Sequence, residues 1–135
     1  MRFLFLIVIS SVILEMNSCQ SPSKPPVTLD DVDLNLDSLV LAHPDSIPLL
    51  LKRGEMRFNN YTYDLALVDL AKAFRLDTNN IKARLLYAEV INRRDSRSPA
   101  EVATAQRLFK SIIAKQPKNL QALVGLAATY TYQRD

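Results

Sequence analysis

The sequence predicts an all-α fold, a short solenoid of stacked helical hairpins, and three observations support this. The chain is rich in leucine and alanine, has no tryptophan and contains only two glycines, as expected of helices. Apolar residues recur every three or four positions in successive segments, which is the period of amphipathic helices. Similar short polar sequences, DTNN and QPKN, close two of these segments. Such repetition is typical of architectures in which neighbouring units bury each other's apolar faces.

An apolar run opens the chain and ends just before the only cysteine. Residues 3–14 are apolar apart from two serines, and this run is shorter than the roughly 20 residues of a membrane-spanning helix. With Arg2 as its charged start, it predicts a signal peptide over residues 1–18. Ser18 and Cys19 resemble the lipobox of bacterial lipoproteins, and the resemblance implies that Cys19 is acylated after cleavage. A plain secreted protein with an incidental cysteine is the alternative.

Two short segments lie between this cysteine and the repeats. Residues 19–28 are rich in proline and serine and predict an extended tether. Residues 29–46 space their apolar side chains helically and predict a cap helix, a leftover second helix that covers the first repeat. An acidic cluster in that segment lacks the spacing of a calcium loop and is interpreted as a helix start, where carboxylates favour the positive end of the dipole. It consists of Asp30, Asp31, Asp33 and Asp37.

Residues 47–80 predict the first hairpin. Two amphipathic helices flank a break at residues 59–62, and Thr62 is the expected cap of the second helix. Three small residues fall where the two helix axes would have to approach closely, because larger side chains would hold the axes apart. They are Gly54, Ala66 and Ala73.

This first hairpin resembles a tetratricopeptide repeat. It has the roughly 34-residue length of that repeat, and Gly54, Ala66 and Ala73 match its small residues. The pair Tyr63–Asp64 and the closing sequence RLDTNN also match, with threonine where the family has proline. The resemblance implies hairpins stacked repeat on repeat; it implies no particular chemistry.

A second, looser copy occupies residues 81–119. Its small residue is Ala88, and Ser98 with Glu101 predicts a capping box at the start of its second helix. Extra residues fall in the turn between its two helices, where insertion costs little. Residues 120–135 match the first helix of an incomplete third copy, so the resemblance extends from the first hairpin to the last residue.

The sequence offers little for catalysis, so we expect no enzymatic activity, cofactor or metal. His43 is the only histidine, and no further histidine or cysteine is placed to complete a zinc site with it. Two isolated glycines cannot form a phosphate-binding loop, and no Gly-x-Ser-x-Gly motif is present. The formal net charge of +3 is interpreted as solvated helix surface. Arg93, Arg94 and Arg97 are likewise expected in a solvated loop, because a nucleic-acid site would need aromatic partners.

By the same resemblance, the first helix of each hairpin lines a concave groove that would bind a protein or peptide. The implied groove residues are Leu51, Glu55, Phe58 and Asn59 in the first repeat, Leu85, Glu89, Asn92 and Arg93 in the second, and Val124, Ala128 and Tyr132 in the last helix. For any one of them, a packing or solvated role is the alternative. Chaperone-binding members of the family clamp a peptide's terminal carboxylate in this groove. Here Glu55 would repel such a group, so we do not expect that partner class.

These features together predict a membrane-anchored, non-enzymatic interaction scaffold in the bacterial cell envelope. Gln20 follows the cysteine in place of aspartate and resembles signals that permit sorting to the outer membrane. The alternative is an N-terminal fragment of a larger repeat enzyme or of a glycan-binding lipoprotein. Residues 120–135 are apolar on more than one side, which predicts self-association or capture of a partner through this helix.

Overall fold

The computed structural model describes residues 29–131, and over this range the chain forms helices and turns without any strand. The all-α prediction is confirmed. Side chains are described from residue 35 onward. The expected signal peptide, Cys19 and its tether, and Tyr132 lie outside the described residues. The helices are α1 (Leu29–Ala42), α2 (Ile47–Asn59), α3 (Tyr63–Leu76), α4 (Ile81–Arg93), α5 (Pro99–Lys115) and α6 (Leu120–Thr131).

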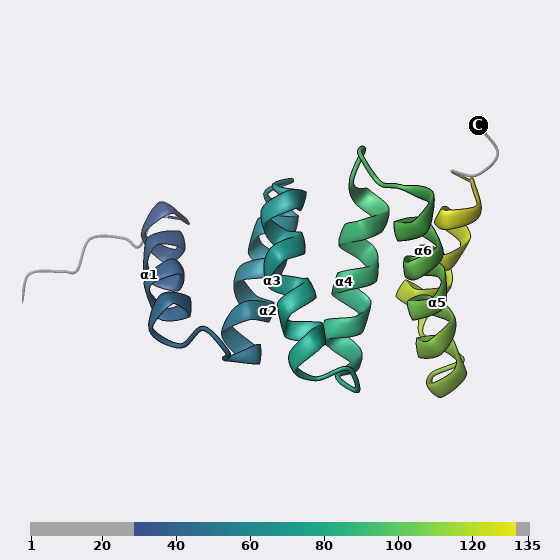
Figure 1. Ribbon diagram of the computed structural model, residues 1–135, viewed down its shortest axis with the longest axis horizontal. Helices are drawn as coiled ribbons and strands as arrows, with labels where there is room; N and C mark the ends of the chain where they lie inside the picture. The colour runs from purple at the N-terminus through teal and green to yellow at the C-terminus, as the bar shows by residue number, and fades with distance from the viewer. Residues whose placement is uncertain (1–28, 132–135) are drawn as a thin grey trace, which may run out of the picture.

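The helices form two layers, and Figure 1 shows them succeeding one another along the long axis of the molecule. Each helix packs on the next one in the chain, and α4 also contacts both α2 and α6. In the described part of the chain, α3 and α5 do not contact each other. The layer of α2, α4 and α6 is therefore the closer-packed, inner one. Among these helices, none has the length and hydrophobicity needed to cross a membrane.

Small residues let α2 and α3 approach closely, as the sequence predicts. A Cβ atom added to Gly54 would lie only 2.6 Å from Cδ2 of Leu70 on α3, so any side chain there would force the buried Leu70 to shift. Ala66 and Ala73 on α3 are fully buried in the same core. At the other end of the stack, a Cβ atom on Gly125 of α6 would lie 2.4 Å from Cζ of Phe109 on α5. Both contacts require glycine because larger side chains would overpack them.

One of the two predicted helix caps forms as expected. The Ser98 side chain accepts a hydrogen bond from the backbone N–H of Glu101, and the Glu101 carboxylate accepts one from the backbone N–H of Ser98, which completes the capping box. Thr62 precedes α3, but its side chain does not cap that helix. Its hydroxyl instead donates to the backbone carbonyl of Arg57 at 2.9 Å, because the turn folds Thr62 back onto the end of α2.

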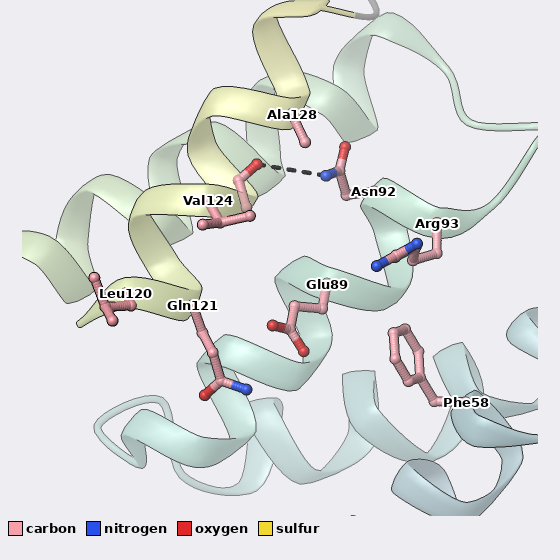
Figure 2. Close-up of a pocket in the computed structure, with 9 residues that line it drawn as sticks. Phe58, Glu89, Asn92, Arg93, Leu120, Gln121, Val124 and Ala128 are labelled. Carbon is pink, nitrogen blue, oxygen red and sulfur yellow. Dashed lines mark hydrogen bonds between the residues drawn. The ribbon is translucent and has the colours of Figure 1, made fainter.

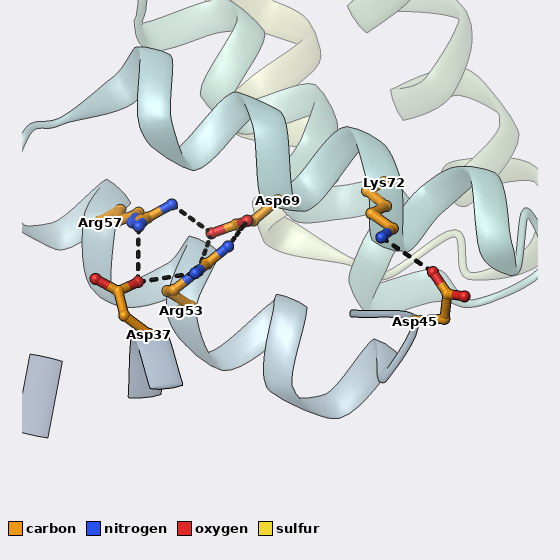
Figure 3. A network of polar contacts seen from close by, with 6 residues as sticks. All are labelled: Asp37, Asp45, Arg53, Arg57, Asp69 and Lys72. Atoms are coloured by element: carbon orange, nitrogen blue, oxygen red, sulfur yellow. Dashed lines mark hydrogen bonds and ion pairs between the residues drawn. The ribbon is translucent and has the colours of Figure 1, made fainter. Parts of the chain in front are cut away.

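A buried ionic cluster joins α1, α2 and α3 (Figure 3). We call it the aspartate clamp: Asp69 of α3, Arg53 and Arg57 of α2, and Asp37 of α1. The side chain of Asp69 is only 2% exposed, and it accepts bonds from Arg53 at 2.6 and 2.8 Å and from Arg57 at 2.9 Å. Outside the arginines, Asp37 accepts from both at 2.8 and 2.9 Å. Asp37 thus attaches α1 to α2. This corrects its interpretation as part of a helix start.

Removing the buried charge of this clamp should strongly destabilise the fold. Asp69→Asn would leave two half-buried guanidinium groups facing a neutral amide, and breaking a buried pair in this way costs about 3 kcal/mol or more. Asp37→Asn should cost less than about 1 kcal/mol, because the Asp37 side chain is 54% exposed. Urea unfolding of both variants measures the difference. Equal losses would show that burial does not set the strength of the clamp.

Candidate functional site

A groove of about 430 Å³ opens on the inner layer of helices. Figure 2 shows Phe58 of α2 and Arg93 of α4 at one end of the groove, and Leu120 and Gln121 of α6 at the other. The side chain of Glu89 on α4 lies between them. The lining residues are Phe58, Glu89, Asn92, Arg93, Leu120, Gln121, Val124, Gly125 and Ala128. Three helices that are separate in sequence therefore build a single concave surface.

Six of the residues expected in a groove line this one. They are Phe58, Glu89, Asn92, Arg93, Val124 and Ala128. Three further residues face the groove that were not predicted to line it: Leu120, Gln121 and Gly125. These three lie next to Val124 or one helical turn before it, so the helical period of α6 was the signal that could have identified them.

The other expected groove residues lie elsewhere. The prediction that Leu85 lines the groove is wrong. Leu85 is 8% exposed and packs in the core with α5, because α4 buries a second face there. Leu51 is buried to the same degree, and it borders a separate depression together with Glu55. Asn59 borders a small hollow next to Phe58 and Arg93.

Glu89 carries the electrostatics of the groove. It is half-buried, and over the described residues its carboxylate makes no hydrogen bond or ion pair. Burial raises the pKa of this carboxyl; the nearby Arg93 opposes the rise, and Glu55 adds to it. The groove thus holds a carboxylate that has lost part of its hydration without gaining a partner.

Two polar side chains near Glu89, those of Asn92 and Glu55, already have partners within the protein. The Nδ2 of Asn92 donates to the carbonyl of Gly125 at 3.4 Å and links α4 to α6 (Figure 2). Lys82 pairs with Glu55 at 2.7 Å. Because the charge of Glu55 is balanced by Lys82, repulsion by Glu55 no longer gives a reason to exclude peptides that end in a carboxylate.

The basic segment after α4 divides into different roles. Arg94 pairs with Asp64 of α3 at 2.7 Å and with Glu101 of α5 at 2.6 Å, and its side chain is only 16% exposed. Arg97 donates to the carbonyl of Arg94 at 2.5 Å. These contacts correct the expectation of a solvated loop for both residues, because Arg94 holds the turn against α3 and α5 and Arg97 bonds to the backbone of the turn itself. Only Arg93 faces the groove.

No protein-family model matches the chain, and no curated protein matches it either. Among the side chains that the structure describes, residues 35–131, no group of three or more His, Cys, Asp and Glu is arranged to hold a metal ion.

The last helix leaves an apolar face open to solvent. Asn80 and Asn119 each accept a hydrogen bond from the third residue of the following helix, so α4 and α6 start in the same register. In α4, the face formed by Leu85, Ala88 and Ile91 is buried against α5. Its counterpart in α6 is solvent-exposed. It consists of Val124, Ala127 and Tyr130, beside the exposed Leu120 and Leu123.

Neutralising Glu89 should stabilise the protein near neutral pH. Burial raises the pKa of Glu89 above its ordinary value of 4.5, so the folded state holds this proton over a window in which the unfolded state has lost it. Stability therefore falls as pH rises through that window. Glu89→Gln should melt at a higher temperature than the unmodified chain at about pH 7, and the difference should vanish below about pH 4.

Glu101→Gln is the matched control, with the opposite sign. Hydrogen bonds from Ser98 lower the pKa of Glu101, so its contribution is present above the ordinary value and is lost as pH falls through the folded-state pKa. This variant should melt at a lower temperature at neutral pH, and the loss should shrink in acid. Shifts of the same sign in both variants would contradict the assignment of burial as the cause at Glu89.

Proposed function

We propose that this protein is a non-enzymatic interaction module of the tetratricopeptide type, anchored to a membrane in the bacterial cell envelope. The observation that carries the proposal is the groove on the inner layer. It is lined by alternate helices of successive hairpins and combines apolar side chains with a few polar ones. Grooves of this kind suit peptide segments of partner proteins, because apolar contacts give affinity and polar groups fix orientation.

Two further features support repeat stacking. The hairpin of α2 and α3 closes on small residues at Gly54, Ala66 and Ala73. Residues of α4 contribute to both core clusters, one with α2 and α3 and the other with α5 and α6. Such nearest-neighbour burial is the basis of solenoid stability.

The proposed anchor is an acylated Cys19. The segment from residue 19 to residue 28 contains three prolines and precedes α1, so it would act as a semi-rigid spacer between lipid and helices. Gln20 favours the outer membrane as the destination. Each buried methylene of an acyl chain contributes about 0.8 kcal/mol, so several chains on one residue give stable attachment.

Labelling with a fatty acid tests this anchor. The full chain, expressed in a bacterium supplied with labelled palmitate, should incorporate label and appear in the membrane fraction. Cys19→Ser should remove both properties, because it lacks the thiol that is acylated. An unmodified chain that takes up no label and remains soluble in the periplasm would rule the anchor out.

We also propose that two copies of the chain associate through the open face of α6. No charged residue occurs between Leu120 and Thr131, so two α6 helices that face each other across a two-fold axis bring no like charges of their own together. A charge beside this helix is Lys110 of α5, whose ammonium lies 5.9 Å from the centre of the Tyr130 ring. In the described structure, Leu123 is 39% exposed and Tyr130 is 44% exposed, and neither side chain lines the groove. Contiguous exposed apolar surface of this kind usually marks an interface.

Site-specific photo-crosslinking in cells tests both surfaces. A photoreactive side chain at Val124, which lines the groove, should give adducts with another protein. At Leu123, on the open face but outside the groove lining, it should give an adduct of two copies. Arg107 of α5 is the matched control, because it is exposed and lines no part of the groove. Identical adducts from all three positions, or none from Val124, would count against the proposed function.

A further inference from the structure

The walls and the floor of the groove differ in chemistry. Phe58, Leu120, Val124 and Ala128 supply apolar surface from α2 and α6. Between these walls lies Glu89, a half-buried carboxylate without a hydrogen-bonding partner in the described structure (Figure 2). Any occupant that covers the apolar walls must therefore also cover this carboxylate.

Covering Glu89 restricts which occupants fit. A carboxylate that loses its remaining water without gaining a donor costs far more than a typical hydrogen bond contributes, so a purely apolar occupant is disfavoured. An acidic occupant would add a second negative charge beside the Glu89 carboxylate, whose pKa is already raised because burial disfavours its charged form. A cationic donor removes the penalty, since charge-assisted hydrogen bonds are the strongest that side chains make.

Arg93 does not reverse this preference. Its side chain is exposed at the rim of the groove, beside Phe58, so it keeps its hydration when the groove is filled. It partly offsets the charge of Glu89 from one helical turn away, but no ion pair joins the two. At the rim, its guanidinium is placed to donate to backbone carbonyls of a bound segment.

We propose that the groove binds a peptide segment of a partner protein that places a lysine or arginine side chain against Glu89 and apolar side chains against Phe58 and Val124. This inference rests on the proposed function of the groove and specifies the class of partner. It is the opposite of a carboxylate clamp: the protein provides the anion and the peptide provides the cation.

Selection from a random peptide library displayed on phage tests the proposal with the full chain as bait. Selected peptides should share a lysine or arginine flanked by apolar residues. Synthetic copies should bind Glu89→Gln about tenfold more weakly, because the variant keeps the shape of the side chain but loses its charge. Binding to Asp95→Asn should be unchanged, since Asp95 carries the same charge in the turn after α4 and lines no part of the groove.

A groove-filling variant, Val124→Trp, separates the possible failures. Its position is 68% exposed, so the fold should accept the larger side chain while peptide binding is lost. Groove-dependent peptides without a cation, or peptides that bind Glu89→Gln as tightly as the unmodified chain, would overturn the cationic preference and leave the groove function standing. Failure to select any peptide, or selection of peptides that bind Val124→Trp equally well, would overturn both.

Discussion

The contact between Gly54 and Leu70 is the constraint on which the rest of the architecture depends. A single methyl group at Gly54 would collide with Leu70, so the spacing of α2 and α3 is fixed by the absence of a side chain. Gly125 and Phe109 impose the same condition where α6 meets α5. With both ends of the stack held at close spacing, α2, α4 and α6 come together as one layer. The groove depends on that spacing, because its walls belong to α2 and α6, the two helices that these glycines place.

The aspartate clamp adds direction to this packing. Apolar contacts are tolerant of small rotations, whereas Asp69 must meet the guanidinium groups of Arg53 and Arg57 in defined geometry. Asp37 accepts hydrogen bonds from the outward-facing N–H groups of the same two arginines. The position of α1 is therefore set by charged groups that belong to the first hairpin. Desolvation of the charges offsets much of the attraction in a buried network of this kind, so the network is not by itself evidence of high net stability.

The helices could be predicted from the sequence, because period, breaks and caps are local properties. The small residues at helix contacts were predictable for the same reason. The face of α4 that carries Leu85 was not, since a pattern shows that a residue is apolar without showing which neighbour covers it. Pairs such as Arg53 with Asp69 join residues on different helices, and no local pattern records them. The sequence showed that residue 89 is a glutamate, but it could not show that this side chain is half-buried, because burial depends on how the helices pack.

The open face of α6 bears on how large an assembly can grow. A two-fold contact uses the same face on both copies, so it is saturated once two chains have met, and a closed pair results rather than a fibre. Growth beyond two would need a second, complementary surface at the far end of the stack. There the accessible part of α1 carries the half-exposed Asp37 beside Leu41, a mixed surface that does not match the uncharged face of α6. In such a pair, the two grooves would lie on either side of a shared α6 seam, so one assembly would present two binding sites.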